Sequence, residues 1–305
     1  MHRSAPVVFS SAYECNIGCH VFPTAKFRMV RDGLIAAGRI TERDLLTPEP
    51  APREDLLLVH SPEYLDDLAC LRRTPRTSMS ELPLTSEIVH AYVVSAGGTT
   101  LASRHALATG AAVHLGGGFH HAFAGLASGF CYINDLAVAV RVMQRDGLVQ
   151  RAAVVDCDLH QGNGTARVFR DDPSVFTLSI HQEHLYPVKE QSDLDIGLEN
   201  GAGDREFNDR LAAALPRVWD HRPELVLYQA GADPFEDDQL GSLRLTFDGL
   251  LERDRLVLAG CAERGIPFVV TLGGGYARRV TDTVRIHQST CELALTLVRA
   301  AKGSA

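Results

Sequence analysis

Six short apolar runs, rich in valine and other strand-forming residues, recur along this chain of 305 residues. They are "PVVFS" at 6–10 and the runs at 110–115, 151–156, 174–180, 224–229 and 267–272. Two of the longer segments between them, 133–148 and 246–266, carry apolar residues at helical spacing. Apolar strands that alternate with helices predict an α/β fold, in which an open, mostly parallel β-sheet is flanked by helices on both faces.

The chain shows no repeat, low-complexity tract or long linker. We therefore expect residues 1–305 to form a single domain, since 45% hydrophobic and 22% charged residues suffice for one large core. Two polar segments, 72–85 and 182–208, are expected to be long surface loops.

Charge and cysteine content narrow the range of partners and locations. The net charge of −8 disfavours binding to nucleic acid or to an anionic membrane, and no apolar run approaches the roughly 20 residues that a transmembrane helix requires. The seven cysteines are an odd number without a pairing rhythm, which indicates reduced thiols in a cytoplasmic protein. Nothing in the sequence selects an oligomeric state.

Four of the predicted strands stop in glycine-rich or ionisable residues. The sequences that follow them are "GGGFHHAFAG", "DCDLHQGNG", "AGADPF" and "LGGGY". In open parallel sheets, ligands bind in the crevice beyond the carboxyl ends of the strands. We therefore expect these four clusters to share one crevice.

Asp158, His160 and Asp233 form a candidate metal site. Asp158 and His160 lie two residues apart, so their side chains share a face of an extended segment. Buried carboxylates require a cation or hydrogen bonds, and a catalytic zinc keeps three protein ligands and one open position. The three side chains therefore predict a metal site with nitrogen and oxygen ligands.

The other strand ends supply candidate acid–base and donor groups. The pair His120-His121 suits proton transfer because imidazole titrates near neutral pH, and Asp156 could orient His120 through a ring nitrogen. Tyr276 follows three glycines, among them Gly274, that let the backbone approach a ligand closely. Its hydroxyl could donate to a developing oxyanion.

Taken together, these motifs resemble the zinc-dependent histone deacetylase superfamily, which shares the arginase-type α/β fold. The segments that carry the resemblance are "GGGFHHAFAGLASGFCYIND", "VVDCDLHQGNGT", "YQAGADP" and "LGGGY", and the similarity runs from about residue 5 to residue 295. Within the superfamily, "HVFPTAKF" at 20–27, "HQGNGT" and "HLYP" at 184–187 resemble the class IV branch and its bacterial relatives.

The resemblance implies an amidohydrolase that removes acyl groups, acetyl or longer fatty acyl, from lysine side chains of a peptide or protein or from related small amines. Zinc would be bound by Asp158, His160 and Asp233, with Fe²⁺ as an alternative because the ligand set is rich in oxygen. The implied catalytic groups are His121 as general base and acid, His120 supported by Asp156, and Tyr276 as the hydroxyl that polarises the carbonyl.

The resemblance also implies residues that contact the substrate and a second ion. Gly129 and Phe130 would form one wall of a substrate tunnel and Tyr186 the facing wall, with Gly274 beside the substrate. A structural K⁺ ion would be held by Ser179 and by backbone oxygens of Asp156, Asp158, His160 and Ile180.

One residue departs from the pattern of many deacetylases, which have aspartate at the position of Asn163. A neutral amide stabilises an imidazolium less than a carboxylate does, so we expect His121 to be less basic here. Class IV relatives share the asparagine. This departure leaves a longer acyl chain open as the preferred substrate.

Three alternative functions make different demands on the sequence. A binuclear manganese hydrolase of the arginase or agmatinase type would need a further aspartate where Phe235 stands. An acylpolyamine or small acylated-metabolite amidohydrolase would use acidic residues at the tunnel mouth, for which the candidates are Glu183, Glu190, Asp193 and Asp195. A catalytically silent protein that binds acylated amines would be expected to lack a ligand, a histidine or the tyrosine, and all of these are present.

Overall fold

The computed structural model describes residues 5–303, whose strands form one sheet in the order β2-β1-β3-β8-β7-β4-β5-β6. Every pair of neighbouring strands is parallel. The strands are β1 (Val7–Val8), β2 (Leu45–Leu46), β3 (Ala111–His114), β4 (Ala152–Asp156), β5 (Val175–Gln182), β6 (Leu194–Leu198), β7 (Leu225–Gln229) and β8 (Phe268–Thr271). Each of the six predicted runs overlaps a strand, although β5 extends two residues beyond its run, and the predicted α/β architecture is confirmed.

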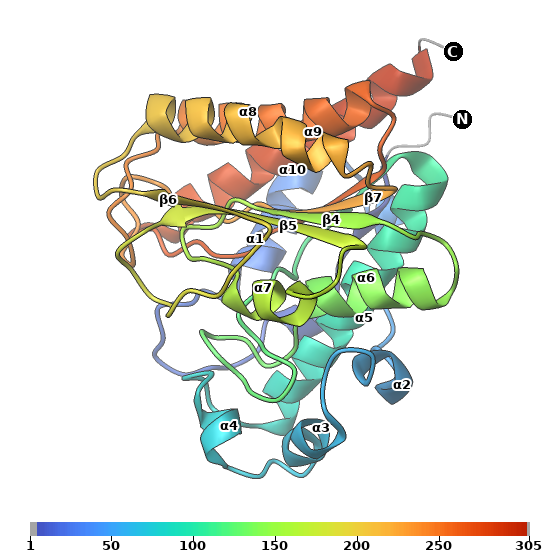
Figure 1. Cartoon of the computed structure of the whole chain (residues 1–305), viewed down its shortest axis with the longest axis vertical. Helices are drawn as coiled ribbons and strands as arrows, with labels where there is room; N and C mark the ends of the chain where they lie inside the picture. The colour runs from blue at the N-terminus through green and yellow to red at the C-terminus, as the bar shows by residue number, and fades with distance from the viewer. Residues whose placement is uncertain (1–4, 304–305) are drawn as a thin grey trace.

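Helices cover both faces of the sheet, as Figure 1 shows, with α8, α9 and α10 on one face and α5, α6 and α7 on the other. The helices are α1 (Lys26–Ala36), α2 (Arg53–Leu56), α3 (Pro62–Ala69), α4 (Pro75–Ser78), α5 (Ser86–Thr109), α6 (Asp135–Arg145), α7 (Asn163–Phe169), α8 (Asp204–Asp220), α9 (Phe247–Glu263) and α10 (Val280–Gly303). The two predicted helices correspond to α6 and α9, which begin after the capping side chains of Asn134 and Thr246.

The four central strands are buried along their whole length. All residues of β3, β8, β7 and β4 are buried, which explains why their sequences are largely apolar and do not alternate with polar residues. Apart from the hydroxyl of Tyr228, the polar side chains of these strands occur where the strands end, at His114, Asp156, Gln229 and Thr271. These polar side chains therefore lie together at the carboxyl ends of the central strands.

The two segments expected as surface loops are more ordered than predicted. Residues 72–85 contain α4, and Thr77 and Ser80 in this segment are buried. Two backbone carbonyl groups of the segment accept hydrogen bonds from the loop that precedes α6: Phe130 N–H donates to Ser80 O at 2.9 Å, and Ala127 N–H donates to Arg76 O at 2.8 Å. Residues 182–208 contain the edge strand β6 and the start of α8. The sequence "LDIGL" of β6 was not predicted as a strand because it is not a continuous apolar run. At the edge of the sheet only Ile196 and Leu198 of this strand are buried.

None of the helices in residues 5–303 has the length and apolar character that a bilayer crossing requires. All seven cysteines lie in this range, and each is a free thiol. The apolar residues of α9, among them Leu250, Val257 and Leu258, are buried in the core.

Candidate active site

The structure brings the three predicted metal ligands together. Asp158 and His160 lie just after β4, and Asp233 lies just after the neighbouring strand β7. His160 Nδ1 is 3.3 Å from Asp158 Oδ1 and 3.2 Å from Asp233 Oδ2. Within residues 5–297 this is the single group of three or more metal-binding side chains whose ligand atoms all lie within 4.8 Å of one another.

The cluster has the charge and geometry of a cation site. All three side chains are buried. In each carboxylate, the oxygen that points away from His160 accepts a hydrogen bond from the backbone: Gly274 N–H donates to Asp158 Oδ2 at 2.9 Å, and Leu159 N–H donates to Asp233 Oδ1 at 2.9 Å. The inner oxygens therefore face His160. Although burial opposes charge on His160, hydrogen bonds to the two carboxylates raise its pKa to about 10, so they strongly favour positive charge at this point.

These donors fit one zinc ion, which accepts mixed nitrogen and oxygen ligands in a site left open on one side. A second metal has no comparable ligand set among the described residues. Phe235, at the position where a binuclear site would need a carboxylate, packs against Phe247 with ring centroids 4.7 Å apart.

The two histidines at the end of β3 have different partners. His120 Nδ1 lies 2.6 Å from Asp156 Oδ2, whereas His121 Nδ1 lies 2.8 Å from the amide oxygen of Asn163. Although burial alone would lower it, Asp156 and Asp158 raise the pKa of His120 to about 9. Burial and the neighbouring His120 hold the pKa of His121 well below 6.5. The pair therefore combines a cationic imidazole with a neutral one that can accept a proton.

Asn163→Asp is expected to make His121 more basic. A carboxylate in contact with His121 Nδ1 stabilises the imidazolium and therefore raises the pKa of His121. If His121 is a general base, it must be neutral to accept a proton, so activity would be lost as pH falls through its pKa. The acid limb of the kcat/KM profile should then move to higher pH in the variant. Asn200→Asp, which adds the same charge at an exposed position, should leave the profile unmoved. An acid limb that stays in place or moves to lower pH in Asn163→Asp would contradict the assignment.

Tyr276 lies at the end of the glycine run after β8 and is 8% exposed. Its backbone N–H donates to Asp238 Oδ2 at 2.7 Å, and its ring packs edge-on to Phe130 with centroids 5.9 Å apart. Burial and the charge of Asp233 raise the pKa of the phenol well above 10. Tyr276 therefore keeps its proton at neutral pH and can act as a hydrogen-bond donor.

A cavity of about 280 Å³ leads from the surface to these groups. Its wall includes three of the predicted substrate contacts, Gly129, Phe130 and Tyr186, and it also exposes His121, His160 and Tyr276. The Tyr186 hydroxyl and Ser128 Oγ are hydrogen-bonded at 2.7 Å, which joins the two sides of the wall. Gly274, the fourth predicted contact, lines a smaller cavity of about 20 Å³ deeper in the protein.

Comparison with known proteins identifies the family. The model of the histone deacetylase domain matches residues 20–291. The chain is 42% identical to an uncharacterized protein of Picosynechococcus sp., over 92% of this chain and 95% of that protein, and 30% identical to histone deacetylase 2 of Arabidopsis thaliana, over 91% and 77%. The crystal structure of an HDAC homolog from Aquifex aeolicus superposes with a TM-score of 0.79 at 26% identity and covers 95% of this chain and 84% of that one.

The chain belongs to the histone deacetylase family. The predicted resemblance is thereby confirmed at the level of the superfamily, as is its arginase/deacetylase fold. Members of the histone deacetylase family are hydrolases that act on amide bonds, so this protein is an amide hydrolase of the deacylase type.

The residues predicted for a potassium ion lie side by side in this deacetylase fold. Asp156 of β4 and Ser179 of β5 are register partners, and Ile180 follows Ser179 in the same strand. The Ser179 hydroxyl lies 2.9 Å from His181 Nδ1. These residues therefore lie next to the segment after β4 that carries Asp158 and His160.

Three site residues of the deacetylase were not assigned from the sequence. Glu81 lines the mouth of the large cavity, in a segment expected to be a plain loop. Asp238 holds the backbone of Tyr276, and only its position five residues after Asp233 could have indicated it. Lys26 is fully buried, and its Nζ donates to Gly273 O at 2.5 Å; burial lowers its pKa to about 8. It lies in the motif "HVFPTAKF", which carried a family resemblance but no assigned role.

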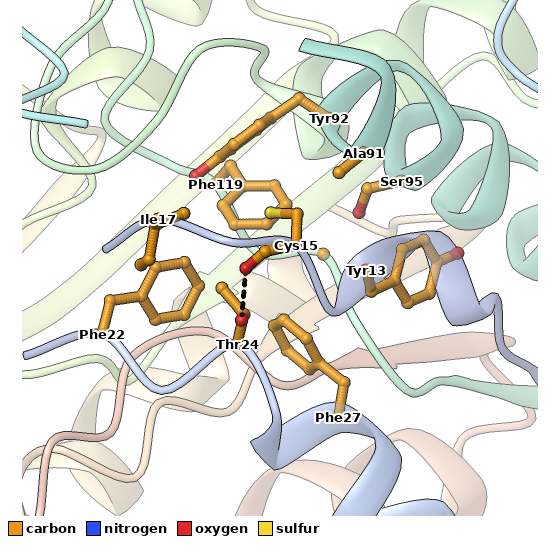
Figure 2. Close-up of a pocket in the computed structure, with 11 residues that line it drawn as sticks. Tyr13, Cys15, Ile17, Phe22, Thr24, Phe27, Ala91, Tyr92, Ser95 and Phe119 are labelled. Atoms are coloured by element: carbon orange, nitrogen blue, oxygen red, sulfur yellow. Dashed lines mark hydrogen bonds between the residues drawn. The ribbon is translucent and has the colours of Figure 1, made fainter. Parts of the chain in front are cut away.

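A mostly apolar space of about 10 Å³ is lined by the residues that Figure 2 shows. Its wall comes from the N-terminal segment, including Ile17 and Phe27, and from Tyr92 of α5. Phe22 and Phe119 line both this space and the small cavity beside Gly274, so the two are separated by these aromatic rings.

Proposed function

We propose that the protein is a zinc-dependent deacylase that hydrolyses the amide bond between a short acyl group and an amine on a linear alkyl chain. Lysine side chains of a peptide or protein are its first candidate substrates. The observation that carries this proposal is the cluster of Asp158, His160 and Asp233, whose His160 lines the same cavity as His121 and Tyr276. We further propose that the whole chain acts as one catalytic domain related to the class IV branch.

Zinc would be held by His160 Nδ1 and by the inner oxygens of the two carboxylates. When bound there, zinc supplies Lewis-acid chemistry, which acidifies water and polarises the acyl carbonyl. Fe²⁺ is the alternative for the same ligands. A K⁺ ion between β4 and β5, bound by Ser179 and by backbone oxygens of neighbouring residues, is part of the same proposal.

The side chains around the metal site supply the proton transfers. His121 Nε2 accepts a proton from the water whose oxygen forms the new bond to the acyl carbon. The Tyr276 hydroxyl donates a hydrogen bond to the carbonyl oxygen as negative charge develops there. Protonated His121 then delivers its proton to the nitrogen as the C–N bond breaks, which leaves a carboxylic acid and a free amine. His120, kept cationic by Asp156, contributes positive charge beside the reacting atoms.

The sizes of the cavities support a short acyl group. A space of about 20 Å³ beside Gly274 holds roughly one water-sized group, and a methyl group has a similar size. A long acyl chain would have to displace Phe22 and Phe119 to reach the apolar space of Figure 2. The aromatic walls of the entrance cavity suit the methylene chain of lysine.

Hydrolysis of acylpolyamines is the second candidate, and Glu81 is the observation that favours it. This exposed carboxylate lines the entrance cavity, where it could attract a distant ammonium group. Three of the four acidic residues expected at the mouth are bound elsewhere: Asp193 accepts from Thr177, Asp195 from Gln161, and Glu190 pairs with Arg170 at 3.7 Å. One mouth carboxylate supports polyamine recognition less than several would.

A panel of acylated amines tests the proposal. Purified protein loaded with zinc is incubated with lysine peptides that carry acetyl, butyryl, octanoyl and myristoyl groups, and with acetylated polyamines. We expect the highest kcat/KM on acetyl-lysine, a decrease as the chain lengthens, slower turnover of the polyamines, and loss of all activity with a chelator. Binding without release of any acyl group would instead support a silent binding protein, and faster turnover of myristoyl than acetyl would overturn the proposed chain length.

A further inference from the structure

Three loops carry the candidate catalytic groups, and all three start at strands in the centre of the sheet, where the order is β3-β8-β7-β4. The histidine loop (residues 115–121) follows β3, the metal loop (157–163) follows β4, and the tyrosine loop (272–276) follows β8. Between β8 and β4 lies β7, whose last residue is Gln229. The relative positions of the three loops decide whether His121, the metal and Tyr276 can act on one carbonyl group.

Gln229 makes a hydrogen bond toward each of these loops. Its side-chain Nε2 donates to Gly118 O of the histidine loop at 2.6 Å. Its Oε1 accepts from Thr271 Oγ1, directly before the tyrosine loop, at 2.8 Å. Its backbone carbonyl accepts from Cys157 N–H at the start of the metal loop at 3.0 Å. The side chain is completely buried, so water does not compete for these bonds.

Two glycines leave room for this side chain. Gly118 has φ +83°, and a Cβ there would lie 2.0 Å from Gln229 Oε1. Gly273 has φ +48°, and a Cβ there would lie 2.4 Å from Gln229 Nε2. The histidine and tyrosine loops therefore both pack their backbones directly against the amide of Gln229.

Asp135 holds the histidine loop from the other side. Its Oδ2 accepts from Gly118 N–H at 3.0 Å and its Oδ1 from Phe119 N–H at 2.7 Å. Asp135 is the first residue of α6 and is fully buried, and Thr99 Oγ1 also donates to it at 2.5 Å. Both backbone polar groups of Gly118 are thus hydrogen-bonded to buried side chains. Asp135 of α6 accepts from its N–H, and Gln229 of β7 donates to its carbonyl oxygen.

We infer that Gln229 is a positioning residue that sets the separation of the histidine, metal and tyrosine loops, with Asp135 as its counterpart on Gly118. The inference rests on the proposed function and deepens it, because Gln229 touches none of the reacting groups. It affects the reaction indirectly, because it positions the backbone of the loops that carry His120, His121 and Tyr276. A displacement of about 1 Å between catalytic groups can lower the rate by about a hundredfold.

Gln229→Met tests the inference, since methionine keeps the length of the side chain and removes both hydrogen bonds of the amide. We expect kcat on an acyl-lysine reporter to fall about 10- to 100-fold while KM stays within about threefold and zinc stays at one ion per chain. In a crystal structure of the zinc-free variant, the distance from His120 Nε2 to Asp158 Oδ1, 3.8 Å here, should increase by about 1 Å.

Tyr228→Phe is the matched control. Tyr228 precedes Gln229 in β7 and is equally buried, but its hydroxyl donates to Asp254 at 2.6 Å on the opposite face of the sheet. It should keep the wild-type kcat and loop separation. If Gln229→Met does not fold, Asp135→Asn removes one acceptor from the same loop and should lower kcat by a smaller factor with KM unchanged.

Wild-type kcat and an unchanged separation in a folded Gln229→Met would overturn the inference, as would a loss of activity explained by loss of zinc. If the wild-type protein hydrolyses no acyl-amine, the proposed function fails. The crystallographic distance then still decides whether Gln229 sets the spacing of the loops.

Discussion

Asp233→Ala should abolish both zinc binding and hydrolysis. Asp233 would supply one of the three proposed ligand atoms, and its loss would leave only Asp158 and His160, which is too few for a site that zinc fills with three protein groups. Zinc per chain, measured by mass spectrometry after dialysis, is expected to fall from one to near zero, and hydrolysis of an acyl-lysine reporter is expected to become undetectable.

Glu236→Ala is the control for Asp233→Ala, because it removes an exposed carboxylate three residues further along the same loop. It should retain one zinc per chain and the wild-type rate. If Asp233→Ala kept stoichiometric zinc in a folded protein, Asp233 would not be a ligand. The single-metal site would then have to be assigned to other residues.

Tyr276→Phe is expected to lower kcat by about 10² to 10³ with little change in KM. The phenol donates to the carbonyl oxygen mainly as charge develops there, and removing one such donor typically costs this much. Because burial and Asp233 keep the pKa of Tyr276 well above 10, the donor is present throughout the neutral range, and the effect should not depend on pH between about 6 and 9.

A second tyrosine separates this effect from a general loss of stability. Tyr64 of α3 is fully buried, and its hydroxyl donates to Tyr132 O at 2.7 Å, away from the metal site. Tyr64→Phe should lower the thermal midpoint slightly and leave kcat unchanged. Equal losses of kcat in Tyr64→Phe and Tyr276→Phe would show that the phenol of Tyr276 has no specific part in the reaction.

The fold was predictable from the sequence where burial leaves a simple pattern. The central strands are buried on both faces, so their runs of valine and leucine stand out, and the capping residue Asn134 and the left-handed Gly147 flank α6. The edge strand β6 and the two-residue strand β2 left no such pattern. The segment 72–85 was misjudged because its order comes from hydrogen bonds to a distant loop, which composition does not reveal.

The residues of the candidate site were likewise predictable only where the sequence carries a clear pattern. Asp158, His160, His121 and Tyr276 follow strand ends, and parallel strands bring their carboxyl ends to one edge, so their convergence could be inferred before any coordinates. The role of Asn163 beside His121 could also be inferred, and the two side chains are in contact at 2.8 Å.

Residues that act through the backbone were not found in this way. Asp238 holds Tyr276 by its N–H, Lys26 donates to Gly273 O, and Gln229 bonds Gly118 O. Each contact joins segments far apart in the chain, or depends on a local turn, and none follows from residue type. Such residues become visible only when the hydrogen bonds of each loop are traced.

Anomalous X-ray diffraction at the zinc absorption edge, on crystals of the zinc-loaded protein, tests the central claim most directly. The account predicts one anomalous peak per chain at the floor of the entrance cavity, bonded to His160 Nδ1 and to one oxygen each of Asp158 and Asp233. Two neighbouring peaks, or a peak that none of these three side chains touches, would contradict it.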